Sequence, residues 1–167
     1  MKTRGRWEND ALRIVLALAV LALMAAIPVG AQEDAPQAIE WSWHLEPATA
    51  QPGSEAVLVL VAKVAPDWVV YSSDFKAELG PLPAKLTRAP NSSLELIDAL
   101  RSVGAKRKHD ASINAEYGYF SKRAELRQRI RLPADGGPIE VRLSGQACYE
   151  VNGSCHLIRQ NIRIAAR

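Results

Sequence analysis

The two cysteines of the chain, Cys148 and Cys155, are the residues whose type and spacing could do chemistry. Six residues separate them, and two cysteines this close are expected to pair as a disulfide in an oxidising compartment. Such a bond can be a structural staple worth about 2.5 kcal/mol through its effect on the unfolded chain, or an exchangeable bond that other thiols attack. From the cysteines alone, the staple is the favoured interpretation.

Motifs for other kinds of chemistry are absent from the sequence. No phosphate-binding glycine loop, Gly-x-Ser-x-Gly elbow or His-Glu-x-x-His motif occurs. The three histidines, His44, His109 and His156, are scattered along the chain, so the sequence predicts neither a metal site nor a cofactor. The carboxylates form no distinctive pair. The two cysteines are therefore the candidate site.

The compartment is indicated by the N-terminus. Residues 14–29 carry no charged side chain, basic residues precede them, and a small-residue site ends at Ala31. This is the layout of a secretory signal peptide, so residues 1–31 are interpreted as a signal peptide cleaved after Ala31, with an uncleaved membrane anchor as the alternative. Residues 32–38 are expected to form a flexible leader. Export would allow the disulfide to form.

Removing the signal peptide changes the charge balance. The full chain has 21 Lys and Arg against 18 Asp and Glu, and the first 31 residues hold four and two of these. The remaining 136 residues carry 17 basic and 16 acidic side chains, which suits one domain and gives nucleic-acid binding no support. The basic run at 106–108 is interpreted as part of a solvated loop.

The elements that must position the cysteines are predicted to be β-strands. Apolar and polar side chains alternate with a period of two in several stretches, as in half-buried strands. These stretches are residues 39–45, 126–132, 139–143 and 158–164. The apolar run 56–64 fits a strand buried on both faces, further strands are expected at 68–72 and 94–97, and residues 101–116 are expected to form a long polar loop. The predicted fold class is all-β, a single antiparallel β-sandwich domain.

The cysteines flank the tip of a predicted hairpin between the last two strands. A two-residue turn at Asn152-Gly153 would place Cys148 and Cys155 diagonally, about 7–8 Å apart. A disulfide needs Cβ atoms about 4 Å apart. A four-residue loop, 150–153, instead places the cysteines directly opposite each other, with Gly153 in the left-handed conformation. We predict this second register.

An aromatic segment, Tyr117-Gly118-Tyr119-Phe120, precedes the strand at 126–132. One interpretation is that its rings fold back into the core. The alternative is an aromatic cap over the disulfide that keeps solvent thiols away until a partner displaces it, with Gly118 as the hinge. A cap would favour the exchangeable bond over the staple.

Several segments, taken in order, resemble the family of N-terminal periplasmic domains of the thiol:disulfide interchange protein DsbD. The resemblance covers most of residues 39–164 and ends with the cysteine hairpin. The other matching segments are Trp41-Ser42-Trp43, Trp68-Val69-Val70-Tyr71-Ser72, Gly80-Pro81-Leu82-Pro83, and Tyr119-Phe120 followed by Lys122 and the strand up to Pro133. One spacing departs from the family pattern, which has five residues between the cysteines where this chain has six.

The resemblance implies an immunoglobulin-like sandwich over residues 39–167 that acts in the periplasm as a thiol–disulfide exchange domain. Such a domain accepts reducing equivalents from a membrane-embedded thiol donor, which here would be a separate protein. It passes them through mixed disulfides to thioredoxin-like or other periplasmic thiol proteins. An enzymatic activity would then be thiol:disulfide interchange, and the domain is expected to be a monomer. The alternative is a non-enzymatic immunoglobulin-like adaptor module with a purely structural disulfide.

Carried over by position, the resemblance makes Cys148 and Cys155 the exchanging pair. Tyr119 or Phe120 would be the cap, and two further side chains, Tyr117 and Tyr71, would line the site. His156 follows Cys155 directly in the sequence. When protonated it could favour the Cys155 thiolate by its charge, or it could point to the opposite face of the strand.

Overall fold

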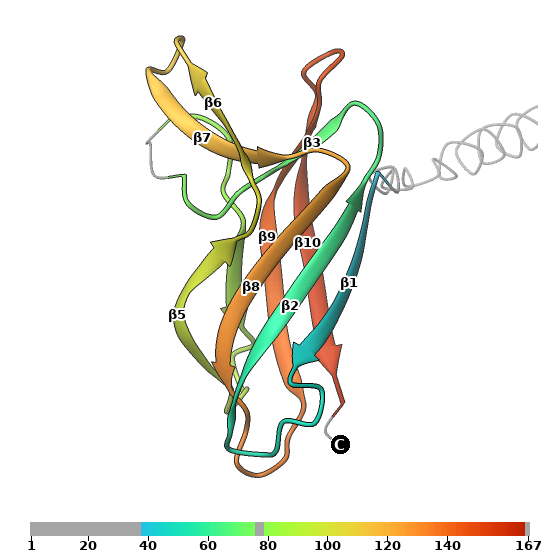
Figure 1. The fold of residues 1–167 in the computed structure, drawn as a ribbon, viewed down its shortest axis with the longest axis vertical. Helices are drawn as coiled ribbons and strands as arrows, with labels where there is room; N and C mark the ends of the chain where they lie inside the picture. The colour runs from blue at the N-terminus through green and yellow to red at the C-terminus, as the bar shows by residue number, and fades with distance from the viewer. Residues whose placement is uncertain (1–37, 76–78, 166–167) are drawn as a thin grey trace, which may run out of the picture. The chain divides into compact units, whose positions relative to one another are not determined.

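The computed structural model describes residues 38–75 and 79–165, which form ten β-strands and no helix (Figure 1). The predicted signal peptide and all but the last residue of the predicted leader lie outside this range. In chain order, the strands are β1 (Ile39–Glu46), β2 (Glu55–Val64), β3 (Trp68–Tyr71), β4 (Lys85–Arg88), β5 (Glu95–Ser102), β6 (Lys106–Asp110), β7 (Ala115–Phe120), β8 (Arg123–Arg131), β9 (Ile139–Tyr149) and β10 (Cys155–Ile164). Within the described residues, no helix could span a membrane.

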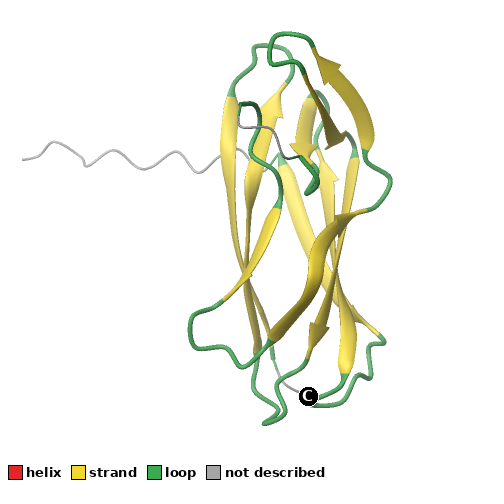
Figure 2. Cartoon of the chain, turned by 90° about the vertical axis from the view of Figure 1, so that its left-hand side faces the viewer, coloured by secondary structure: helices red, strands yellow, loops and turns green. Residues whose placement is uncertain are grey.

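The strands form two antiparallel sheets that pack face to face (Figure 2). The four-stranded sheet has the order β1-β2-β8-β5. The six-stranded sheet has the order β10-β9-β3-β7-β6, with β4 also pairing with β9. Strand β9 is long enough for β4 and β3 to pair with successive parts of it. The predicted all-β fold, an immunoglobulin-like antiparallel β-sandwich, is confirmed.

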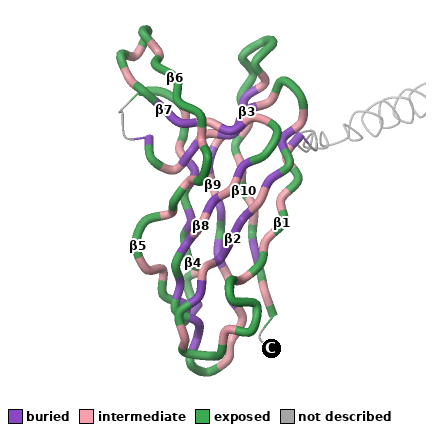
Figure 3. The backbone as a smooth tube through the Cα atoms, in the orientation of Figure 1, coloured by how far each residue is buried: buried purple, intermediate pink, exposed green. Residues whose placement is uncertain are grey.

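The core lies between the sheets and is built from alternate residues of the long strands (Figure 3). Leu58 and Leu60 of β2, Leu126 of β8, and Leu143 and Ile162 of the β9–β10 hairpin are at most 2% exposed. The residues between them along each strand point outward, because successive side chains of a strand alternate between the faces of a sheet. The alternation read from the sequence therefore gives the correct inward face of these strands.

The expected long loop at residues 101–116 is wrong. Strand β5 continues to Ser102, and the β6–β7 hairpin follows. The β6 side chains from Lys106 to Asp110 are all polar, and all but Asp110 are exposed. A strand with water on both faces shows no apolar period, so the pattern gave no indication of it. The tips of this hairpin and of the β9–β10 hairpin project at the same end of the sandwich (Figure 1).

Candidate redox site at one end of the six-stranded sheet

The β9–β10 hairpin has the predicted register. Cys148 lies directly opposite Cys155, and the four-residue loop 150–153 is closed by the Tyr149 amide, which donates to the Ser154 carbonyl at 2.8 Å. Gly153 has a φ of +73°, a conformation that side-chain-bearing residues rarely adopt. The prediction made from disulfide geometry and turn chemistry is therefore confirmed.

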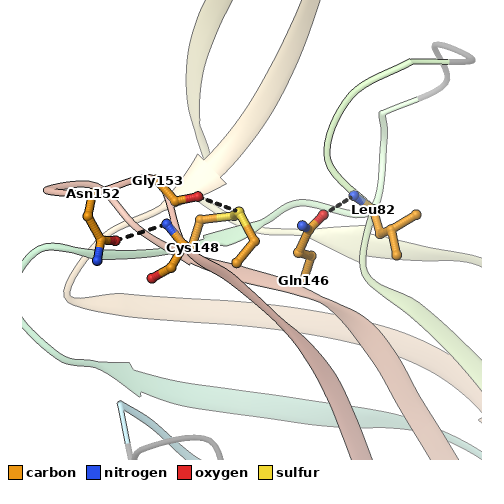
Figure 4. The surroundings of a disulfide bond; sticks show 7 residues. Leu82, Gln146, Cys148, Asn152 and Gly153 are labelled. Atoms are coloured by element: carbon orange, nitrogen blue, oxygen red, sulfur yellow. Dashed lines mark hydrogen bonds between the residues drawn. A yellow bond between two sulfur atoms is a disulfide. The ribbon is translucent and has the colours of Figure 1, made fainter.

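The two cysteines form a disulfide with their Cα atoms 4.0 Å apart. The neighbouring pair, Tyr149 and Ser154, shares a ladder hydrogen bond, so the cysteines occupy the adjacent non-hydrogen-bonded position, where cross-strand side chains approach most closely. The Asn152 side chain stabilises the loop by accepting a hydrogen bond from the Ser154 amide at 2.9 Å (Figure 4). Strand pairing and loop chemistry together hold the sulfur atoms in bonding range.

The two cysteines differ strongly in burial. Cys148 is only 6% exposed, because β9 lies inside the sheet and Val69 of β3 is directly opposite it. Cys155 is exposed, since β10 is an edge strand. A thiol that approaches from solvent therefore meets Cys155 first.

Strand register places a row of tyrosines on the same outward face as the disulfide. Val69 is opposite Cys148, and Tyr71, two residues along β3, is opposite Tyr119 of β7. Residues opposite each other share a face, as do residues two apart on a strand. Tyr71, Tyr119 and Tyr117 therefore lie on the face that carries the disulfide.

Phe120 points the other way. It lies opposite Val70, is 3% exposed and belongs to the hydrophobic core between the sheets. Of the two cap candidates, only Tyr119 lies on the disulfide face, where it is half-buried. Its backbone is two strands, about 10 Å, from that of Cys148.

A small hollow lies beside Val69, the β3 residue opposite Cys148, and we refer to it as the tyrosine pocket. It has a volume of about 170 Å³ and is lined by Val69, Tyr71, Lys108, Tyr117, Tyr119 and Glu150. The rings of Tyr71 and Tyr117 meet edge to face with their centres 5.4 Å apart. Lys108 and Glu150 are lining residues that the sequence did not single out, because the β6 strand and the hairpin loop gave no pattern that would connect them.

Burial dominates the electrostatics of the tyrosine pocket. It raises the pKa of Tyr71 to about 12, with smaller contributions from the neighbouring Tyr117 and the carboxylates of Glu150 and Asp110. A buried phenol resists ionisation because its charged form loses hydration. Tyr71 is therefore a neutral hydrogen-bonding group at physiological pH.

His156 lies on the face opposite the disulfide. Its ring packs against Trp68 with centres 5.4 Å apart, and Trp68 also contacts the ring of Tyr149 at 5.5 Å. His156 is opposite Ala147, a core residue, whereas Cys155 next to it faces outward. The structure thus gives the second of the two arrangements considered for this histidine.

Gly118 is required by close packing. A Cβ atom at this position would overlap the Oγ of Ser72 and lie 2.9 Å from its Cβ, whereas the hinge interpretation assigned the glycine to conformational freedom. The Ser72 hydroxyl donates to Asp74, which in turn pairs with Arg107 of β6. This connection joins the end of β3 to the β6–β7 hairpin, and its members gave no recognisable pattern in the sequence.

The Asp74 carboxylate is stabilised in its charged form. Partial burial raises its pKa, but hydrogen bonds from Ser72 and its own backbone, together with the charge and hydrogen bond of Arg107, outweigh this and lower the pKa below its ordinary value. Elsewhere among residues 38–75 and 79–165, no group of three or more His, Cys, Asp or Glu is placed to hold a metal ion. The two sulfur atoms of the disulfide can undergo exchange with a thiolate.

Comparison with known proteins agrees with this geometry. The family model described as "Thiol:disulfide interchange protein DsbD, N-terminal" matches residues 38–163. Among curated proteins, no sequence matches the chain.

The solved structures that match the chain include the following three, of which the first has a TM-score above 0.5 and shares the fold. The complex between the DsbD N-terminal and PilB N-terminal domains of Neisseria meningitidis is 12% identical, with a TM-score of 0.51 over 83% of this chain and 91% of that one. The reduced N. meningitidis DsbD N-terminal domain is 17% identical, with a TM-score of 0.49 over 75% and 85%. The N-terminal periplasmic domain of Proteus mirabilis ScsB is 13% identical, with a TM-score of 0.47 over 75% of this chain and 44% of that one.

Proposed function

This chain belongs to the family of DsbD N-terminal domains, and on that premise we propose that it carries reducing equivalents in the periplasm through the Cys148–Cys155 pair. The observation that supports this most directly is the unequal burial of two cysteines joined at a hairpin tip, one enclosed by neighbouring strands and the other exposed. A purely structural staple has no need of this asymmetry. An exchange reaction benefits from this asymmetry, because one sulfur must be accessible to the partner while the other stays protected until it resolves the mixed disulfide.

The exposed sulfur, that of Cys155, is proposed as the contact atom. In the reduced domain its thiolate attacks a disulfide of the partner, forming a mixed disulfide and releasing one partner thiolate. The Cys148 thiolate then attacks the Cys155 Sγ, which restores the Cys148–Cys155 bond and releases the second partner thiolate. Two electrons pass to the partner, whose thiolates take up two protons. The short Cα–Cα distance of 4.0 Å keeps the second attack intramolecular and fast.

The tyrosine pocket is proposed to border the contact site, with Tyr119 as the cap. Tyr119 is half-buried on the disulfide face, two strands from Cys148, and it is proposed to limit the approach of small thiols from the side of the β6–β7 hairpin. Tyr71 and Tyr117 pack edge to face against each other and line the same pocket as Tyr119. Replacing Tyr119 with alanine should speed reaction of the disulfide with a small uncharged thiol such as 2-mercaptoethanol, and an unchanged rate would remove Tyr119 from this role.

The partners follow from the proposed chemistry. A DsbD N-terminal domain has been solved in complex with a PilB N-terminal domain. For this chain we propose thioredoxin-like or other periplasmic thiol proteins as acceptors, a membrane-embedded thiol protein as donor, and a monomeric domain. The cleaved signal peptide at residues 1–31 remains a prediction from the sequence.

Trapping tests the proposal. Cys148→Ala leaves the exposed thiol without its resolving partner, so we expect this variant to accumulate mixed disulfides with exported proteins in the cell. Cys155→Ala leaves only the buried thiol and should trap several-fold less. If neither variant traps a partner, and if the reduction potential lies below about −300 mV, where structural disulfides are found, the bond is a staple and the domain is an adaptor module.

A further inference from the structure

The strands of the two sheets carry very different charge. Those of the four-stranded sheet hold six Lys and Arg against six Asp and Glu. Those of the six-stranded sheet, β4 included, hold eight Lys and Arg against three Asp and Glu. The sheet that carries the disulfide is therefore strongly cationic, although the domain as a whole is close to neutral.

Several of these cations form no ion pair, although the carboxylates of Asp110 and Glu150 lie near Lys108. Lys85, Arg142 and Arg159 of β4, β9 and β10, and Lys106 and Lys108 of β6, are all exposed. None forms an ion pair with a carboxylate of residues 38–75 or 79–165. Charges left unpaired on one face create a positive potential that extends into solvent by about 10 Å at moderate ionic strength.

One group of cations follows the disulfide along the β9–β10 ladder. Leu157, on the same outward face, lies two residues beyond Cys155 and is 51% exposed. Arg159 is the next outward residue and is opposite Ser144, which is itself opposite Lys85 of β4. Four residues of strand span about 14 Å. Along β10, the disulfide is therefore followed by the exposed Leu157 and then by the cation of Arg159, with Lys85 two strands away.

A second group lies across the disulfide, on β6. Lys108 lines the tyrosine pocket, and the Nζ of Lys106 lies 6.0 Å from the centre of the Tyr119 ring. Both lysines share the outward face with the tyrosines that they oppose in the β6–β7 hairpin. The disulfide therefore has cations on both sides and an exposed leucine next to it, and one carboxylate, that of Glu150 in the hairpin loop, lines the tyrosine pocket with Lys108.

We infer that the outward face of the six-stranded sheet is the docking surface for the redox partner, and that this partner carries carboxylates around its reactive thiol with an apolar residue beside it. This rests on the proposed function. Complementary charge steers encounter and fixes orientation more than it adds affinity. An anionic lipid surface would also attract the cations, but it would cover the bond that has to remain open to a protein thiol.

Two synthetic dithiol peptides test the inference on the full domain. They share one Cys-x-x-Cys core, flanked by glutamates in one peptide and by lysines in the other. A peptide thiolate attacks the Cys155 Sγ and displaces the Cys148 thiolate, and the second peptide thiol then resolves the mixed disulfide. The peptide is oxidised to its disulfide and the domain is reduced to its dithiol. Each rate is divided by that peptide's rate with bis(2-hydroxyethyl) disulfide, which corrects for differences in thiol reactivity.

We expect the glutamate peptide to react about tenfold faster than the lysine peptide at about 0.01 M salt, and the two to converge near 1 M salt, where the Debye length is about 3 Å. The charge reversals Lys85→Glu with Arg159→Glu should remove most of the difference. Arg101→Glu is the control on the other sheet, to be compared with each single reversal, because Arg101 is exposed, has no ion pair among the described residues and lies on the four-stranded sheet. It should leave the ratio nearly unchanged.

Equal normalised rates for the two peptides at low salt would overturn the inference, as would an equal effect of the Arg101 control. Co-sedimentation with phosphatidylglycerol vesicles that Lys85→Glu with Arg159→Glu abolishes, without any difference between the peptides, would assign the face to a membrane instead. If neither peptide exchanges at all and the trapping variants capture nothing, the proposed function itself fails. If both exchange equally, only the charge inference fails.

Discussion

The outward faces of the two sheets differ in how many of their charged side chains form ion pairs and in how exposed their apolar side chains are. On the four-stranded sheet, Arg129 pairs with Glu55 at 2.9 Å and with Asp98 at 2.7 Å, and Arg131 pairs with Glu55 at 2.9 Å and Glu95 at 2.8 Å. The other two arginines of β8 are also paired. On the six-stranded sheet, Arg107 pairs with Asp74 and Arg163 with Glu140. The exposed cations with no carboxylate partner among the described residues include Lys85, Lys106, Lys108, Arg142 and Arg159.

The apolar residues follow the same division. Val59 lies on the outward face of β2 but is only 1% exposed, because it sits between His44 and Arg127 in the sheet and long polar side chains can cover apolar surface with their stems. Leu157 lies on the outward face of β10 and is 51% exposed. The four-stranded face thus pairs the arginines of β8 and covers Val59, although Arg101 has no ion pair among the described residues and Val103, just beyond β5, is 45% exposed. The face around the disulfide is left open, as expected for a surface that completes itself with a partner.

Removing the reactive bond should give the largest effect and should act on one face only. The double variant Cys148→Ala with Cys155→Ala should lose exchange with the dithiol peptides completely. It should also lose about 2.5 kcal/mol of the free energy of unfolding, since the eight-residue loop is no longer closed in the unfolded chain. Urea denaturation and the exchange assay measure the two quantities. Arg129→Gln, on the four-stranded sheet, should leave exchange intact. A similar loss of exchange in that variant would contradict the assignment of the exchange reaction to the six-stranded sheet.

Gly118→Ala should destabilise the part of the six-stranded sheet that carries the tyrosine pocket. The added methyl group overlaps Ser72, so β3 and β7 must separate, at a cost of about 1–3 kcal/mol in unfolding free energy by urea denaturation. The tyrosine pocket is built on these two strands and should loosen with them. In the double variant with Ser72→Ala, the loss should be smaller than the sum of the two single losses. Additive losses would show that the overlap is not the cause.

The sequence was sufficient where the determining constraint is local. Cys148 and Cys155 can be bonded only if they are directly opposite, and Gly153 supplies the conformation that the longer loop needs, so the hairpin register could be worked out in advance. The alternation at residues 139–143 likewise identifies the inward face, because burial on one side leaves a period of two.

The sequence was insufficient where the constraint comes from a distant partner. Strand β6 is held by β7 and by the ion pair between Arg107 and Asp74, which no local pattern reveals. Tyr119 and Phe120 could not be separated as cap candidates until the pairing of Phe120 with Val70 was known. The charge division is hidden for a similar reason. Composition sums over both sheets, and only the fold assigns each charged residue to one of them.

Acid should weaken the ion pairs of the four-stranded face. Hydrogen bonds from Arg129 and Arg131 lower the pKa of Glu55 below its ordinary value of 4.5, and a hydrogen bond from Arg127 does the same for Glu46. The unfolded chain therefore takes up these protons at a higher pH than the folded domain, so their contribution to stability is present above pH 4.5 and is lost as the pH falls through the folded pKa. The urea midpoint of Glu55→Gln should fall less steeply with acid than that of the wild type. Identical slopes would show that these pairs are not coupled to folding.

Alkali should give the smallest effect, on the opposite face and with the opposite sign. The pKa of Tyr71 is raised to about 12 mainly by burial, so the folded domain keeps this proton at a pH where the unfolded chain has released it. Its contribution to stability is present below the ordinary pKa of 10.0 and is lost as the pH rises through the folded value. Absorbance of tyrosinate, followed in rapid pH jumps, should show one of the four tyrosines ionising near pH 12, and Tyr71→Phe should remove that step. If the step survives in Tyr71→Phe, it belongs to another tyrosine, and Tyr71 is not the group whose ionisation burial suppresses.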